Sequence, residues 1–182
     1  SPYGELSMGR TGALDAGTGR YGMLAGNATA MGTGWDAVGN SDFILKGTKS
    51  RMDNTITYQS PSFAGVTVLA QASLKTDPMD AAVDADYVEG SSDANRYYGL
   101  GVKFNAGALN AGIVGGVSDY SRLDVTTNVD EDNGYSVAGY INYDFGMIKP
   151  MFAVQYWNGG VESSTGAAFK DTEGYGLVIG AT

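Results

Sequence analysis

Charged side chains are the residues of this sequence that could do chemistry, and their distribution is uneven. The chain carries 20 acidic and 11 basic residues, a formal net charge of −9. Most of the acids fall in four segments, 11–50, 76–95, 121–133 and 159–173. Acids grouped in this way, Asp15 among them, are typical of solvated loops. A surface of this sign repels nucleic-acid phosphates, so we expect no nucleic-acid partner.

Two residue types that carry much of enzyme chemistry are missing. The chain has no histidine and no cysteine. This excludes Ser-His-Asp and Cys-His catalysis, thiolate metal sites and disulfides. The acidic stretch DPMDAAVDADYVEG (77–90) lacks the ligand order and central glycine of an EF-hand. We therefore expect a protein that is not an enzyme, with no catalytic residue, no metal site and no cofactor.

The elements that must position the charges are β-strands. Stretches of alternating residues, separated by glycine, polar or acidic residues, predict eight of them. They lie at about 2–10, 51–60, 65–75, 96–105, 108–120, 134–145, 148–158 and 174–182. A short helix is also compatible with GMLAGNATAM (22–31). No window approaches 18 consecutive apolar residues, which argues against a transmembrane helix but not against transmembrane strands.

The lengths of the connections alternate along the chain. Short turns, SPSFAG, NAGA and GM, alternate with the four long acidic segments. Strands joined by tight turns are antiparallel, so all short turns lie at one end of the sheet and all long segments at the other. Outer-membrane barrels sort their turns and loops in this way, whereas a soluble sandwich has no reason to.

Each strand has one apolar face and one polar or glycine-rich face. In 65–75, Val66, Val68 and Leu74 oppose Thr67, Gln71, Ser73 and Lys75. A half-buried soluble sheet alternates in the same way. The glycines and lysines of the polar face, the sorted loops and strands long enough to cross hydrocarbon favour a membrane barrel with a wet interior.

Three motifs carry a resemblance to a known family. GELSMGRTGAL (4–14), GWDAVGNSDF (34–43) and RMDNTITYQSPSFAGVTVLAQ (51–71) resemble the general diffusion porins of Gram-negative bacteria. The resemblance implies an all-β, transmembrane, antiparallel up-and-down barrel of sixteen strands that assembles as a homotrimer. About eight of those strands, the fifth to the twelfth, would lie here. Residues 1–182 would be one barrel domain, a fragment of the whole, and 11–50 its infolded constriction loop.

The same resemblance assigns residues to the pore. Arg10 and Arg51 would form the basic cluster on the wall, and Asp36 and Asp42 are the acidic candidates on the loop, although the Pro-Glu-Phe-Gly-Gly segment of that loop is absent. Strand parity puts Arg10 outward, toward lipid, so we expect a bulge or bend at Gly9 that turns it inward. A structural tie between the arginines and the loop is the alternative. Further lining residues are expected to be Asp53, Lys75, Lys103 and Lys149.

The predicted function is passive diffusion of small hydrophilic solutes and ions through a water-filled channel of the cell outer membrane. The expected partners are outer-membrane lipid and lipopolysaccharide, two further copies of the chain, and the solutes. The residues leave the sign of ion selectivity open. Three alternatives remain: a solute-specific porin, for example for sugars; an eight-stranded outer-membrane barrel with a structural, adhesive or enzymatic role; and a soluble β-sandwich adhesin or lectin.

Overall fold

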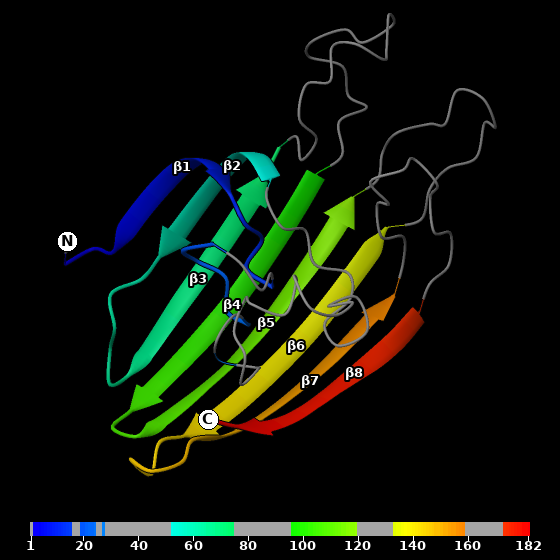
Figure 1. The fold of residues 1–182 in the computed structure, drawn as a ribbon. Coiled ribbons are helices and arrows are strands. Elements are labelled where there is room, and N and C mark those ends of the chain that lie inside the picture. Colours follow the sequence, from blue (N-terminus) through cyan, green and yellow to red (C-terminus); the bar gives the residue numbers. More distant parts are fainter. Residues whose placement is uncertain are drawn as a thin grey trace, which may run out of the picture.

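The computed structural model describes residues 2–15, 19–24, 27, 52–74, 96–119, 133–158 and 173–182. These residues form one sheet of eight strands, each hydrogen-bonded to its neighbours in chain order (Figure 1). The strands are β1 (Glu5–Thr11), β2 (Met52–Gln59), β3 (Val66–Ser73), β4 (Arg96–Ala106), β5 (Leu109–Asp119), β6 (Gly134–Tyr143), β7 (Pro150–Asn158) and β8 (Glu173–Ala181). The prediction of an all-β, antiparallel, up-and-down fold with eight strands is confirmed.

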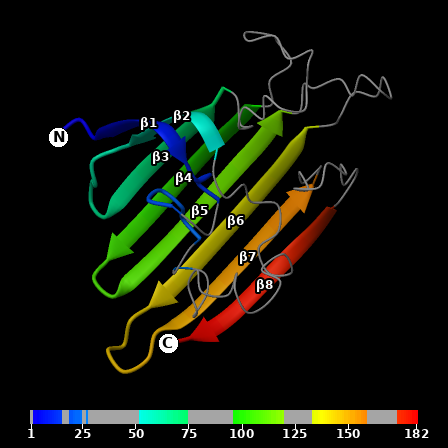
Figure 2. The same cartoon turned by 45° about the horizontal axis from the view of Figure 1, so that its top comes forward.

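Consecutive strands pair over nearly their whole length. The β4–β5 ladder runs without interruption from Arg96↔Asp119 to Ala106↔Leu109. The sheet is open, with β1 and β8 at its edges. It is twisted, as Figure 2 shows, which is the ordinary consequence of the right-handed twist of each strand.

The short turns β2–β3, β4–β5 and β6–β7 lie together at the lower end of the sheet in Figure 1, as the connection lengths predicted. Their geometry depends on glycine. Gly107 adopts a φ of +58° in the β4–β5 turn, and Gly146 a φ of +84° in the β6–β7 turn. Asp144 Oδ1 accepts a hydrogen bond of 2.7 Å from Gly146 N, which closes that turn.

The two faces of the sheet have opposite chemistry and opposite exposure. The face that we call the outer face carries large apolar side chains that are exposed. They include Leu6, Met8, Ile56, Val68, Leu100, Ile113, Val137, Ile141, Phe152, Val154, Leu177 and Ile179. The inner face carries buried polar residues, such as Thr55, Thr57, Gln71, Ser136 and Gln155, together with glycines and a buried apolar cluster around Leu69 and Val114. A soluble sheet buries its apolar face, so this arrangement is the reverse of the usual one.

The inner face is covered by the chain that follows β1. We call its described part, residues 12–15, 19–24 and 27, the inner segment; Figures 1 and 2 show it lying across the sheet. Leu14, Met23 and Leu24 are fully buried and cluster with residues of the sheet, among them Leu69 and Val114. Of the stretch 22–31, for which a short helix was considered, the described residues 22–24 and 27 are not helical, and the others lie outside the described residues. Within the described part of the chain, no helix is long and apolar enough to cross a membrane.

Candidate functional site

Glycines on the inner face provide room for large side chains. The Tyr97 ring lies over Gly99 and Gly116, where an added Cβ would come within 2.8 and 2.7 Å of Tyr97 Oη. The Tyr140 ring occupies the space above Gly112, where an added Cβ would be 2.7 Å from the ring. Gly101 lies directly under Met23 Sδ of the inner segment. Because these positions lack a side chain, the two tyrosine rings lie flat on the sheet, and Met23 of the inner segment approaches the backbone of β4 closely.

Asp15 is a buried carboxylate at the start of the inner segment. It is 2% exposed, and its Oδ1 accepts a hydrogen bond of 2.9 Å from the Tyr97 hydroxyl on β4. Its Oδ2 accepts a second hydrogen bond from the Ser136 hydroxyl on β6. Burial raises the pKa of Asp15, and the two hydroxyl donors oppose that rise because they stabilise the charged form. The carboxylate thus joins the inner segment to two strands of the sheet.

Two further groups of contacts hold the inner segment. At the β1 edge, Glu5 forms an ion pair of 2.7 Å with Arg20 and accepts a hydrogen bond from the Tyr21 hydroxyl. Toward the short turns, Asn27 Oδ1 accepts from Asn110 Nδ2 at 2.8 Å, and the Asn27 carbonyl accepts from Asn142 Nδ2 at 3.1 Å. The segment is therefore fixed at the edge, the middle and the lower part of the inner face.

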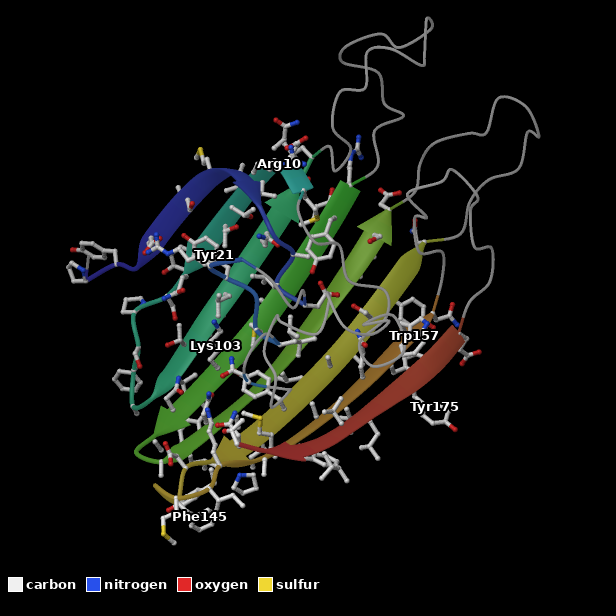
Figure 3. The ribbon with its side chains drawn as sticks, viewed as in Figure 1. Arg10, Tyr21, Lys103, Phe145, Trp157 and Tyr175 are labelled. Carbon is white, nitrogen blue, oxygen red and sulfur yellow. The ribbon has the colours of Figure 1, made fainter. Side chains whose placement is uncertain are left out.

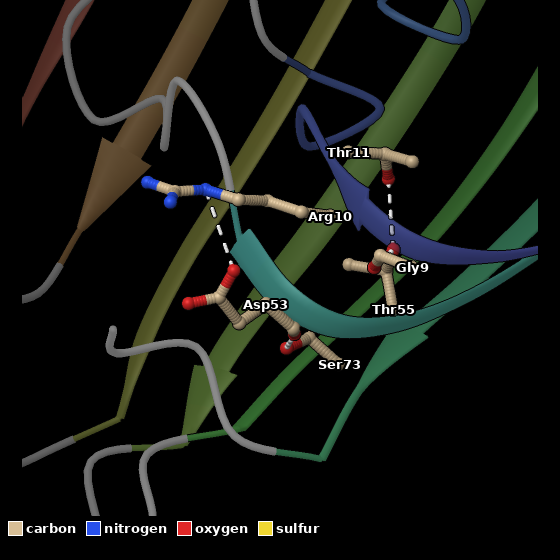
Figure 4. A network of polar contacts seen from close by, with 6 residues as sticks. All are labelled: Gly9, Arg10, Thr11, Asp53, Thr55 and Ser73. Atoms are coloured by element: carbon tan, nitrogen blue, oxygen red, sulfur yellow. Dashed lines mark hydrogen bonds and ion pairs between the residues drawn. The ribbon is translucent and has the colours of Figure 1, made fainter. Parts of the chain in front are cut away.

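A ladder of neutral polar groups runs beside the segment on β1 to β3. Gln71 Nε2 donates to Thr57 Oγ1, to Thr11 Oγ1 and to the Gly12 carbonyl at 2.9, 3.0 and 3.1 Å. Thr55 Oγ1 lies 3.0 Å from Thr11 Oγ1 and also donates to the Gly9 carbonyl (Figure 4). Thr57 is 1% exposed, so this part of the wall is packed rather than open to water.

Arg10 lies where the β1–β2 register is irregular. Gly9 pairs with Thr55 and Thr11 with Met52, so Asp53 and Asn54 together oppose Arg10. The predicted irregularity is present, and its extra residue belongs to β2, where Asn54 has a φ of +50°. The Arg10 Nε atom lies 3.3 Å from Asp53 Oδ1, an ion pair drawn as a dashed line in Figure 4, and the Arg10 side chain is 58% exposed. Its orientation toward a channel stays a prediction.

The other predicted site residues divide into two groups. Lys103 projects from the inner face of β4 and is half-buried (Figure 3). Lys149 lines a recess of about 440 Å³ at the short-turn end, together with Asn110, Asn142 and Asp144. Arg51, Asp36, Asp42 and Lys75 lie outside the described residues. The described part of the chain therefore brings together Arg10 and Asp53 alone among the predicted residues.

Several polar atoms of the inner face have no hydrogen-bond partner within the described protein. They are Gln71 Oε1, Tyr140 Oη, Asn142 Oδ1 and both amide atoms of Gln155. Buried polar groups are usually paired with protein or water. Among the residues described, no group of histidine, cysteine, aspartate and glutamate could hold a metal ion.

Asp15 is the residue that sequence reasoning missed. It was grouped with the solvated acids of 11–50, whereas the structure buries it between Tyr97 and Ser136. Its partners are 82 and 121 positions away along the chain, and no local pattern marks them. Tyr97 and Ser136 do share the parity of the polar face, which is the signal that places them on the same side as the segment.

Taken together, the site is a partly polar wall whose glycines seat Tyr97, Tyr140 and Met23 and over which the inner segment is fixed. Comparison with known proteins identifies the family. A family model described as Gram-negative porin matches residues 1–182, the whole chain. No curated protein matches the chain.

Proposed function

The chain belongs to the Gram-negative porin family, and on this premise we propose that it forms the wall of a water-filled outer-membrane channel for passive diffusion of small hydrophilic solutes and ions. The observation that carries the proposal is the reversed amphipathicity of the sheet. Large apolar side chains cover the exposed face, whereas the enclosed face combines buried polar side chains and glycines with the apolar residues on which the inner segment packs. Lipid on the first face and water on the second satisfy both.

The outer face supports contact with acyl chains along the middle of the strands. Leu100 is 60% exposed and Ile113 is 57% exposed. Between the strand ends, the outer face of the described strands carries no aspartate, glutamate, lysine or arginine. A soluble protein would place charges among these positions, since contiguous apolar patches mark contact with a partner or a membrane.

Aromatic residues of the outer face gather near both ends of the strands. Toward the ends that the long segments join stand Tyr98, Tyr135, Tyr156 and Tyr175; Tyr156 pairs with Tyr175, and the rings of Tyr135 and Tyr156 are 6.1 Å apart. Toward the short turns stand Tyr58, Phe63, Phe104, Tyr143 and Phe145, with the last two rings 4.6 Å apart. Two aromatic rows flanking an apolar band correspond to the two water–lipid interfaces of a membrane barrel.

The segment 11–50 is proposed to be the loop that narrows this channel. Its described residues lie on the inner face, where they are held by Glu5, Asp15 and Asn27. We further propose that Arg10 and Arg51 on the wall face Asp36 and Asp42 on the loop, and that Asp53, Lys75, Lys103 and Lys149 line the passage.

The field across such a passage is modest. One unit charge acting over ~9 Å contributes about 0.5 kcal/mol in bulk water and about 2 kcal/mol at an effective dielectric constant near 20. Salt reduces these energies further. They bias the passage of ions several-fold without binding them tightly. The proposal is therefore a weakly selective diffusion channel.

Assembly follows from the same proposal. The open edges β1 and β8 expose unpaired backbone groups, which hydrocarbon does not tolerate. We propose that further strands of one longer barrel cover these edges. The barrel would assemble as a trimer, and its acidic loops would contact lipopolysaccharide through bridging divalent cations.

The experiment that tests the function is solute flux through the full-length protein in liposomes. Vesicles that carry the protein should swell in isotonic solutions of small sugars, at rates that fall steeply with sugar size. Protein-free vesicles and vesicles with heat-denatured protein serve as controls. Swelling rates equal to those of the protein-free vesicles would overturn the proposal, and saturable uptake of one sugar would indicate a solute-specific porin instead.

A further inference from the structure

The attachment of the inner segment to the middle of the wall depends on a charged group. The contacts at the edge involve Glu5, Arg20 and Tyr21, of which Arg20 is exposed. The contacts at Asn27 are between neutral groups. The contact at Asp15 differs from both, because it is made by a carboxylate that is almost fully buried. Hydrogen bonds from its two hydroxyl partners compensate for the hydration that it loses on burial.

The seat of Asp15 is built across three strands. Tyr97 stands on β4 and Ser136 on β6, and Gly116 of β5 lies between them, paired with Gly99 on one side and with Ser136 on the other. An added Cβ at Gly116 would be 2.7 Å from Tyr97 Oη. The missing side chain therefore lets the tyrosine ring extend over β5, where its hydroxyl reaches the same carboxylate as Ser136.

The described residues that line the seat of Asp15 are apolar or carry neutral hydroxyls. Ala13, Leu14 and Met52 are fully buried beside it, and the side-chain hydrogen-bond partners of the carboxylate are the hydroxyls of Tyr97 on β4 and Ser136 on β6. No lysine or arginine of the described residues forms an ion pair with Asp15. Removal of one hydroxyl would leave a buried carboxylate without one of its side-chain hydrogen-bond donors. The free energy of such a group falls when it moves into water.

We propose that Asp15 is a positioning residue whose carboxylate, seated between the Tyr97 and Ser136 hydroxyls, holds the inner segment against the wall and thereby sets the open cross-section of the channel. The part concerning the channel rests on the proposed function. The part concerning the segment rests on the seat alone. Because the buried charge is what makes both hydroxyls necessary, the seat makes a prediction that ordinary packing does not: neutralising Asp15 should rescue the loss of a hydroxyl.

The test measures hydrogen exchange of residues 12–24 by mass spectrometry in the full-length protein reconstituted into vesicles. In Tyr97→Phe, this exchange should be about tenfold faster or more, the factor expected from loss of one hydrogen bond to a charged group. In the double variant Tyr97→Phe with Asp15→Asn, it should return toward the parent rate. Tyr135→Phe makes the same change on the outer face and should exchange like the parent protein.

Single-channel recording of the same variants tests the second part. Tyr97→Phe should broaden the distribution of conductance levels, and the double variant should narrow it again. Exchange in Tyr97→Phe equal to that of the parent, or no rescue by Asp15→Asn, would overturn the inference; if Tyr97→Phe does not fold, Ser136→Ala takes its place in both comparisons. If Tyr97→Phe exchanges faster as predicted but the parent protein conducts no ions, the proposed function is overturned and the positioning of the segment is still demonstrated.

Discussion

Replacement of Val154 by arginine tests the assignment of the outer face at its most sensitive point. Val154 is the middle residue of β7, is 44% exposed and pairs with Gly139 and Leu177 on the neighbouring strands. If this face touches acyl chains, the guanidinium would lie near the bilayer midplane. An arginine at that depth destabilises a membrane barrel by about 2–4 kcal/mol.

A matched control comes from the same strand and the same face. Asn158 lies four residues from Val154, which at ~3.3 Å per residue is about 13 Å along the strand. An arginine at this position would reach the interface, where its effect falls to about 0–1 kcal/mol. Both variants introduce the same side chain, so the difference between their stabilities reports only how deep in the bilayer the charge lies.

The assay is equilibrium unfolding of the full-length protein from vesicles in guanidinium chloride. Val154→Arg should lower the folding equilibrium constant roughly 30- to 900-fold, the factors that correspond to about 2–4 kcal/mol. Asn158→Arg should lower it by less than about tenfold. Equal stability of the two variants would refute the reasoning, because a face in contact with water accepts arginine at either position.

Three further predictions concern the inner face. Gly101→Val should unseat Met23, since even a Cβ at Gly101 overlaps its sulfur, and residues 12–24 should then become more sensitive to proteolysis; an unchanged cleavage pattern would contradict the seat. Arg51→Gln should shift the ion selectivity of single channels toward cations, and an unchanged reversal potential in a salt gradient would indicate a structural tie instead. Because burial raises the pKa of Asp15 above 3.8, its charge opposes folding at neutral pH, and protonation removes that opposition. The stability of the parent relative to Asp15→Asn should therefore rise as the pH falls through the raised pKa, and level off below 3.8; a fall on acidification would contradict the assigned burial.

The strands and their facing could be predicted because a β-strand displays its environment directly in sequence. Alternation of apolar and polar residues with period two places Val137 and Ile141 on one face and Ser136 and Asn142 on the other, as found. Strand ends were less well defined, since exposed turn residues such as Phe145 and Ile148 continue the alternation beyond the ends of β6 and β7.

The contacts of the inner segment could not be predicted, because they join residues that are distant along the chain and carry no periodic signal. Asp15 was assigned to solvated loop acids, since an isolated aspartate in a loop gives no indication of its partners. The expected irregularity near Arg10 followed from the physical cost of a lipid-facing charge, but its location in β2 depends on the left-handed conformation of Asn54, a residue that tolerates it. The space above the inner glycines is filled by Tyr97, Tyr140 and Met23, which strand periodicity alone does not indicate.

The most direct test of the account is a spin-label scan of β6 in vesicles. The chain has no cysteine, so single cysteines can be introduced at each position from Tyr135 to Tyr143 without other changes. The account predicts that the collision rate with oxygen, which dissolves in the acyl chains, is high at Tyr135, Val137, Gly139, Ile141 and Tyr143 and low at the positions between them. High collision rates with a water-soluble nickel complex at Val137, Gly139 and Ile141 would contradict it.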